Sequence, residues 1–232
     1  MKAIVTDGQL AQLAVKQHEL FARAKKGVYA SFEVMLDALQ QVIEGKVPTI
    51  PVLASAGEKF AKWRTFLIGG VDKKSLLQRV KSGFSVSDWA QDLMKQKAFT
   101  TLEKEEEIDT IILTPRDFGY ERNHPTTVEL LDPVRLAKWS QENAERLDGH
   151  VVELLPAEAG LHIRNQYKDQ PLGEVLWIAM ERITDSDGDP CVFIVERFDG
   201  GEQWLNTYWT RPDAEWNLGN RIVFRLRKVT QA

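Results

Sequence analysis

Three aspartates at alternate positions form the most suggestive metal-binding pattern in this sequence. Asp185, Asp187 and Asp189 occupy the first, third and fifth places of a twelve-residue acidic loop, and Glu196 falls at the twelfth. A calcium loop of that kind needs glycine at the sixth place for its sharp turn, and the residue here is Pro190. Aspartate and glycine also favour turns for conformational reasons of their own. We therefore expect a structural turn, with a metal site as the alternative.

The other residues that could do chemistry give weaker signals. None of the four histidines has a second histidine at helical spacing; they are His18, His124, His150 and His162. The only cysteine, Cys191, precedes an apolar run, which predicts an inert thiol in a core strand and excludes an internal disulfide. Nucleophile-elbow, P-loop and dinucleotide-binding motifs are absent from the sequence. We expect no catalytic residue, no cofactor and no enzymatic activity.

The segment 204–220 combines large aromatic side chains with polar ones, a mixture typical of adaptable binding surfaces. We assign Trp204, Leu205 and Trp216 to the core. The remaining candidates form the predicted ligand-binding surface: Asn206, Thr207, Tyr208, Trp209, Thr210, Arg211, Ala214, Glu215, Asn217 and Asn220. In this hypothesis the aromatic rings anchor the ligand, the charged pair sets its charge preference, and the asparagines adjust hydrogen bonds.

Composition limits the class of protein that can present such a surface. The chain has 232 residues, is 43% hydrophobic and 28% charged, and carries a net charge of -4. These values exclude a wholly disordered or fibrous protein and give no overall basic field for nucleic acid. No apolar run approaches the roughly 18 residues that a membrane span needs. The first residues lack the apolar core of a signal peptide, so we expect a cytoplasmic protein without a membrane span.

Residues 1–56 are predicted to form an N-terminal helical region and linker. Apolar residues recur at helical spacing over 10–24 and 31–43, and two prolines in 47–51 interrupt regular structure. Residues 57–232 are predicted to form the second domain. Its expected helices cover 72–80, 132–147 and segments that begin at 87 and 156, and its expected strands cover 63–68, 99–102, 108–113, 175–183, 191–198, 203–209 and 221–228. Helices followed by an antiparallel meander indicate an α+β protein.

Five segments of this second domain resemble the variable proteins of diversity-generating retroelements. They are GFSVSDWA at 83–90, LLPAEAG at 154–160, QYKDQP at 166–171, WIAMERITDSDGD at 177–189 and RIVFRLRK at 221–228. The resemblance covers roughly residues 60–230 and implies a C-type lectin-like fold of the formylglycine-generating type, an antiparallel sheet flanked by two helices. It says nothing about the identity of the ligand.

The resemblance also implies a C-terminal variable region at about residues 204–222. Reverse transcription that errs at template adenines leaves residues such as Asn206, Tyr208, Asn217 and Asn220. The fixed framework between them would comprise Trp204, Leu205, Pro212, Trp216 and Arg221. The expected function is therefore recognition of an unknown macromolecule through hypervariable side chains.

Two features depart from the family pattern. Residues 1–47 lie outside the expected fold and are candidates for oligomerisation or attachment. The lone Cys191 lacks the cysteine pairing of formylglycine-generating catalysis, which favours a binding scaffold. An adaptor that docks a partner or nucleic acid remains an alternative, because the last strand carries Arg221, Arg225, Arg227 and Lys228. An enzyme on the same scaffold is a third possibility.

Overall fold

Nine strands, spread from Arg64 to Lys228, build one large mixed sheet. A computed structural model describes residues 59–121 and 124–229, within a unit that begins at Lys59. The predicted N-terminal helices and the linker lie outside the described residues. The same is true of the segment considered for oligomerisation. The described helices and strands, in chain order, are β1 (Arg64–Ile68), α3 (Lys73–Lys81), β2 (Ser85–Val86), α4 (Asp88–Lys95), β3 (Glu106–Leu113), the 3-10 helix η1 (Pro115–Phe118), α5 (Thr127–Leu130), α6 (Pro133–Glu142), β4 (His150–Glu153), α7 (Ala159–Gln166), β5 (Val175–Ile178), β6 (Ile183–Thr184), β7 (Pro190–Arg197), β8 (Gln203–Trp209) and β9 (Arg221–Lys228).

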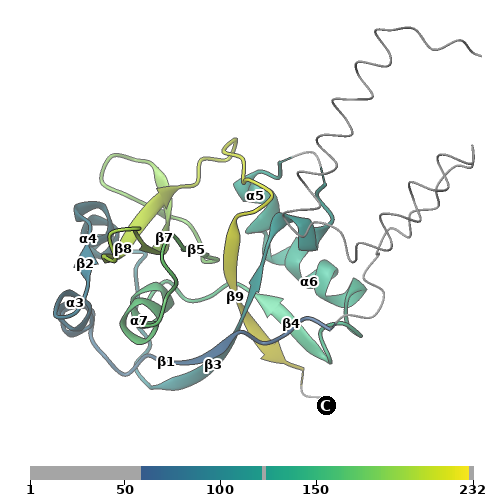
Figure 1. Cartoon of the computed structure of the whole chain (residues 1–232), viewed down its shortest axis with the longest axis horizontal. Helices are drawn as coiled ribbons and strands as arrows, with labels where there is room; N and C mark the ends of the chain where they lie inside the picture. Colours follow the sequence, from purple (N-terminus) through teal and green to yellow (C-terminus); the bar gives the residue numbers. More distant parts are fainter. Residues whose placement is uncertain (1–58, 122–123, 230–232) are drawn as a thin grey trace, which may run out of the picture. The chain divides into compact units, whose positions relative to one another are not determined.

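The sheet has the order β1-β3-β9-β5-β7-β8-β2, with β4 also paired to β9 and β6 to β7. Most neighbours are antiparallel, but β5 runs parallel to β9 and β2 runs parallel to β8. The chain is therefore an α+β protein, as the element order predicts. Strands β5, β7 and β8 pair in the order of the expected antiparallel meander, but the prediction that the last strand continues it is wrong. The final strand β9 lies in the middle of the sheet between β3 and β5, because the segment after β8 carries the chain back across two strands (Figure 1).

The helices cover the sheet in two groups. Helix α7 contacts β1, β7 and β8, with α3 beside it and α4 on β8, whereas α6 packs on β4 next to α5 (Figure 1). Helix α7 approaches β7 so closely that a Cβ at Gly160 would lie 2.9 Å from the Cβ of Phe193. Glycine at this position therefore lets the helix and the strand pack in contact. Both flanking residues, Ala159 and Leu161, are fully buried in the core.

Local capping signals correctly locate the first two helices of the described unit. The side chain of Asp72 accepts hydrogen bonds from the main-chain N–H groups of Lys74 and Ser75, and that of Ser87 accepts from Ala90. Such caps satisfy donors that have no partner within a helix. Strands β8 and β9 also have the bounds that residue alternation predicts.

Three predicted elements differ from the structure. Residues 99–102 form no strand, because the N–H of Leu102 donates to the buried carboxylate of Glu158 instead of to a neighbouring strand. The expected strand 175–183 is divided into two strands, β5 and β6. Between them, the N–H of Ala179 donates to the carbonyl of Val223 on β9, and its carbonyl accepts from the N–H of Leu155. Helix α6 ends at Glu142, five residues earlier than predicted, where the side-chain amide of Asn143 donates to the carbonyl of Trp139.

Candidate ligand-binding face

The pairing register of β7 and β8 separates the predicted ligand-binding residues onto two faces of the sheet. Asn206 lies opposite Ile194, and Tyr208 lies opposite Val192. Since successive side chains point to opposite sides of a strand, Thr207 and Trp209 lie on the other face. We use the name aromatic face for the side of β5, β7 and β8 that carries Trp177, Ile194, Glu196, Trp204, Asn206 and Tyr208.

Three aromatic rings form the centre of the aromatic face and its border with the following loop. The ring centroid of Trp177 lies 6.0 Å from that of Tyr208 and 5.8 Å from that of Trp216, both edge to face. Trp216 is buried, as predicted, while Tyr208 remains 44% exposed. Edge-to-face pairs favour this arrangement by about 0.5–1.5 kcal/mol beyond the area they bury. The cluster therefore supports Tyr208 from below while its outer surface stays open.

The loop after β8 is held by main-chain hydrogen bonds to the segment before α5. The N–H of Thr127 donates to the carbonyl of Ala214 over 3.0 Å, and the N–H of Trp216 donates to the carbonyl of Pro125 over 2.8 Å. The buried hydroxyl of Thr127 adds a bond of 2.7 Å to the carbonyl of Arg211. These bonds do not use side chains of the loop, so its backbone path depends little on which side chains it carries.

A groove of about 500 Å³ continues the aromatic face toward the start of β9. Leu172 and Trp177 line one part of it, and Asn217 and Asn220 line another. The predicted framework residue Arg221 also lines the groove. There it pairs with Glu174, which is buried and accepts a second hydrogen bond from the hydroxyl of Tyr167. Burial and the Glu174 carboxylate both raise the pKa of Tyr167 above its ordinary range.

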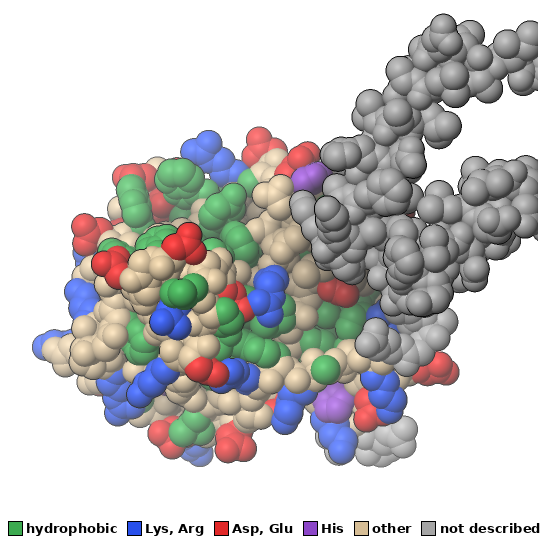
Figure 2. Space-filling view, viewed as in Figure 1, with side chains coloured by type: hydrophobic (Ala, Val, Ile, Leu, Met, Phe, Trp, Pro, Cys, Tyr) green, Lys and Arg blue, Asp and Glu red, His purple; other side chains and the backbone are tan. Residues whose placement is uncertain are grey.

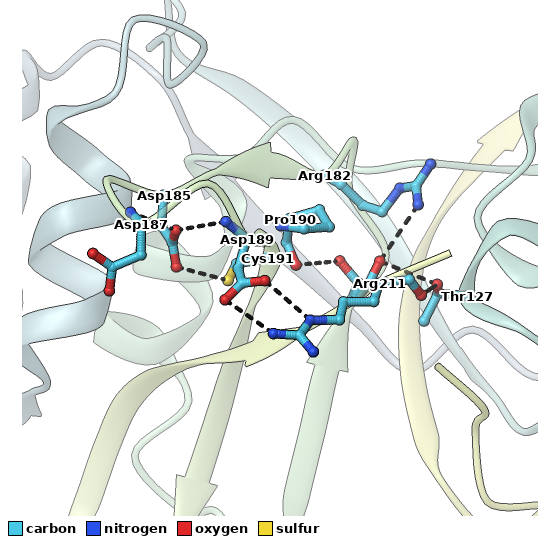
Figure 3. A network of polar contacts seen from close by, with 9 residues as sticks. Thr127, Arg182, Asp185, Asp187, Asp189, Pro190, Cys191 and Arg211 are labelled. Atoms are coloured by element: carbon cyan, nitrogen blue, oxygen red, sulfur yellow. Dashed lines mark hydrogen bonds and ion pairs between the residues drawn. The ribbon is translucent and has the colours of Figure 1, made fainter. Parts of the chain in front are cut away.

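The carboxylates of Asp185 and Asp189 in the hairpin loop have structural partners (Figure 3). The carboxylate of Asp185 accepts the N–H groups of Asp187 and Asp189 over 3.0 and 2.9 Å, and the thiol of Cys191 lies 3.6 Å from it. Asp189 forms two hydrogen bonds with Arg211, of 3.0 and 3.3 Å. In residues 59–121 and 124–229, no group of three or more histidine, cysteine, aspartate or glutamate side chains could hold a metal ion. The loop thus matches the structural turn that its sequence predicts.

Cys191 is buried in β7, which confirms the predicted location of the thiol. Burial, followed by the charge of Asp185, raises its pKa to about 12. A thiol of that kind is protonated near neutral pH and is a poor nucleophile.

Two predicted positions need correction. Thr210 is fully buried and cannot contact a ligand, and its N–H and its hydroxyl both donate to the carbonyl of Pro190 across the hairpin. Trp204, expected in the core, is only partly buried, and its ring packs on the exposed Phe198 at the border of the aromatic face. Leu205 is fully buried, as predicted.

The remaining predicted site residues fall into two sets. On or beside the aromatic face lie Asn206, Tyr208, Asn217 and Asn220. The others lie away from it. Thr207 and Trp209 are on the opposite face of β8, and Arg211 forms an ion pair with Asp189. Ala214 and Glu215 pair through their backbone with residues 126–127.

The sequence does not place Trp177 and Glu196 on the ligand-binding face, because both lie in runs typical of core strands, and Glu196 stands out only as the twelfth residue of a possible metal loop. The available signal was the single carboxylate in the apolar run at 191–196. Glutamate is rarely buried without a partner, so its presence there indicates a special environment.

The basic last strand is largely neutralised by carboxylates. Arg225 pairs with Glu106 over 3.0 Å, and Arg227 pairs with Glu153 over 2.7 Å. Arginine, lysine and acidic side chains are interspersed over the visible face of the described unit (Figure 2). This arrangement provides no continuous basic stripe of the kind that binds phosphate backbones.

Comparison with models of protein families, with curated proteins and with solved structures finds no match to this chain. The sheet and helices define the class as α+β. None of the helices in the described residues has the length and apolar character that a membrane crossing requires.

Proposed function

We propose that this chain is a ligand-binding protein whose C-terminal variable region, about 204–222, is diversified by a retroelement. In this proposal the α+β unit is a C-type lectin-like scaffold, and its binding site is the aromatic face with the adjoining groove. The protein binds a macromolecule and catalyses no reaction.

The observation that carries the proposal is the separation of backbone from side chains in the variable region. The loop after β8 is fixed by bonds from Pro125–Thr127, which lie outside that region. Asn217 is exposed, and Asn220 and Asn206 are partly so. A ligand site that must change its side chains without losing its fold needs this arrangement.

In this proposal the ligand is recognised by one rigid aromatic ring together with several side-chain amides. Tyr208 offers a supported, half-exposed ring, which gives contact area at low entropic cost. Asn206, Asn217 and Asn220 carry amides that can both donate and accept hydrogen bonds. Trp209 contributes nothing to this surface, because it lies on the opposite face of β8.

A pair of randomised libraries tests the proposal. The first varies Asn206, Tyr208, Asn217 and Asn220, and the matched library varies Ile194, Leu205, Thr210 and Trp216, which are all buried. We expect most members of the first library to resist proteolysis on a display platform, whereas most members of the second are cleaved. Equal loss of folded members from both libraries would contradict the proposal.

A further inference from the structure

The aromatic face includes a carboxylate, Glu196, beside Trp204, and this group bears on what the face can bind. Glu196 is only 7% exposed. In the sheet it lies directly opposite Trp204 on β8 and Val175 on β5. Directly opposite residues have Cβ atoms about 4.5–5.5 Å apart, and diagonal neighbours are within reach of long side chains. Trp177 and Asn206 are diagonal neighbours, so two indole rings, an aliphatic side chain and one amide lie beside Glu196. The carboxylate of Glu202 also lies beside Trp204, whose indole N–H it accepts over 3.3 Å.

Glu196 has the fewest partners of the buried carboxylates in the described part of the chain. Its single side-chain hydrogen bond is accepted by Oε1 from the amide of Asn206, over 3.1 Å. By contrast, the carboxylate of Glu174 pairs with Arg221 and accepts from the hydroxyl of Tyr167. The carboxylate of Glu158 accepts from the N–H of Leu102 and lies 3.5 Å from His162. The carboxylate of Asp185 accepts from two main-chain N–H groups.

No lysine, arginine or histidine among residues 59–121 and 124–229 forms an ion pair with the side chain of Glu196. The nearest basic contact is to its main chain, where Arg164 lies 3.4 Å from the carbonyl oxygen. That guanidinium also bonds the side chain of Gln203, which points to the side of β8 opposite Trp204.

The second carboxylate oxygen of Glu196 is accessible from outside. Four buried side-chain atoms lack a hydrogen-bond partner and have almost no accessible surface, on Glu158, Arg164, Trp177 and Trp216. Oε2 of Glu196 also has no hydrogen-bond partner within the described residues. It is not one of these four atoms, so its accessible surface is not close to zero. It therefore keeps some contact with solvent.

We infer that the aromatic face accepts a basic side chain of the ligand, a lysine ammonium or an arginine guanidinium, at Glu196. A carboxylate that is buried without a cation is electrostatically unsatisfied, and a cation from a partner supplies the missing charge. Indole and phenol rings attract the same cation through their π faces, and the exposed stem of the side chain can pack on them. Trp177 and Trp204 provide such rings beside Glu196. The inference rests on the proposed function and names the chemistry of its ligand.

The proposed subsite combines a carboxylate that diversification leaves unchanged, Glu196, with a neighbour that it changes, Asn206. Glu196 lies on β7, outside the variable region, whereas Asn206 lies within it. Replacing Asn206 by aspartate would place a second carboxylate beside the first and increase the preference for a cation. Replacing it by tyrosine would remove the amide from Oε1 and add another ring. Diversification at this codon would thus adjust a charge preference that Glu196 sets.

Titration of the full-length protein with amino-acid probes tests the inference. The probe is N-acetyl-lysine methylamide, the arginine analogue is the second probe, and the norleucine analogue is the uncharged control of similar shape. We expect the basic probes to shift the indole N–H signals of Trp177 and Trp204 in a 1H–15N NMR spectrum. Norleucine should bind at least about tenfold more weakly, because it lacks the charge.

Two variants show whether the effect belongs to Glu196. Glu196→Gln keeps the shape and an oxygen acceptor for Asn206, and should weaken binding of the lysine probe by about tenfold or more. Glu107→Gln removes an exposed carboxylate on β3 and should leave that affinity unchanged. Equal binding of the lysine and norleucine probes, or wild-type affinity in folded Glu196→Gln, would overturn the inference.

The probe experiment can fail independently of the proposed function. Codon diversity at 206, 208, 217 and 220 without any preference for basic probes would remove the cationic subsite and leave the diversified face. A lysine preference that depends on Glu196, in a gene without codon diversity, would establish the subsite on a fixed binding protein.

Discussion

The main-chain N–H of Thr127 donates to the carbonyl of Ala214 over 3.0 Å, which joins α5 to the middle of the loop after β8. The hydroxyl of the same threonine reaches the carbonyls of Arg211 and Thr210 over 2.7 and 3.2 Å. One residue outside the loop after β8 thus holds the loop with two donors, its N–H and its hydroxyl. The loop can keep its path whatever its exposed side chains are.

Removal of that hydroxyl should loosen the loop. Thr127→Val retains the shape of the side chain but leaves two carbonyls without this donor, at a site that is 1% exposed. We expect a loss of about 1–2 kcal/mol in the free energy of unfolding, measured by urea denaturation. Thr100→Val, at an exposed threonine, is the control and should change stability by less than about 0.5 kcal/mol. Equal effects of the two substitutions would show that the hydroxyl does not hold the loop.

Surface and core residues of the segment 204–222 should differ sharply in their effect on stability. The double substitution Asn217→Ala and Asn220→Ala should change the free energy of unfolding by less than about 0.5 kcal/mol, because neither side chain supports the core. Trp216→Ala should cost about 3–5 kcal/mol, since it empties a buried aromatic site. Denaturation curves of both variants provide the comparison. A large loss in the asparagine variant would place those residues in the framework.

The raised pKa of Cys191 predicts both its reactivity and a pH dependence. The folded protein should react with a thiol reagent at pH 8 only as fast as it unfolds, while the urea-unfolded chain reacts at once. Because the pKa is about 12 in the folded state and near 9 when the thiol is free, the folded state holds the proton more tightly. This contribution to stability is complete below pH about 9 and is lost as the pH rises toward 12. Rapid labelling of the folded protein would contradict the buried position.

A side-chain amide covers the outer edge of β1. Gln166 accepts from the N–H of Leu67 over 3.2 Å and donates to its carbonyl over 2.8 Å, as a neighbouring strand would. Because open edges promote pairing between chains, Gln166→Ala should increase self-association in sedimentation experiments. Gln166→Glu keeps the acceptor alone and should have an intermediate effect. Unchanged association of both variants would mean that this edge is protected by other means.

The sequence predicts much of the local structure and less of the long-range pairing. Residue alternation locates β8 and β9, and the caps at Asp72 and Ser87 locate two helices, because these signals depend on neighbouring residues. The central position of β9 depends on contacts with β3 and β5 far away in the chain. Nothing close to it in the sequence indicates that placement.

The same distinction applies to the candidate site. Period-two alternation already separates Tyr208 from Trp209 once β8 is accepted as a strand. The burial of Thr210 could not be predicted, because its partner is the carbonyl of Pro190 on the preceding strand. Glu196 was missed for a related reason, since its neighbours Trp204 and Val175 come from two other strands.

Sequencing the 3′ end of this gene across many cells of its source population tests the central claim most directly. Our account predicts amino-acid changes at adenine-bearing codons within about 204–222, including those of Asn206, Tyr208, Asn217 and Asn220, with the rest of the gene constant. The codons of Trp177 and Glu196 lie outside this region and should be invariant. Silent substitutions spread evenly over the whole gene, with no excess between codons 204 and 222, would contradict the account.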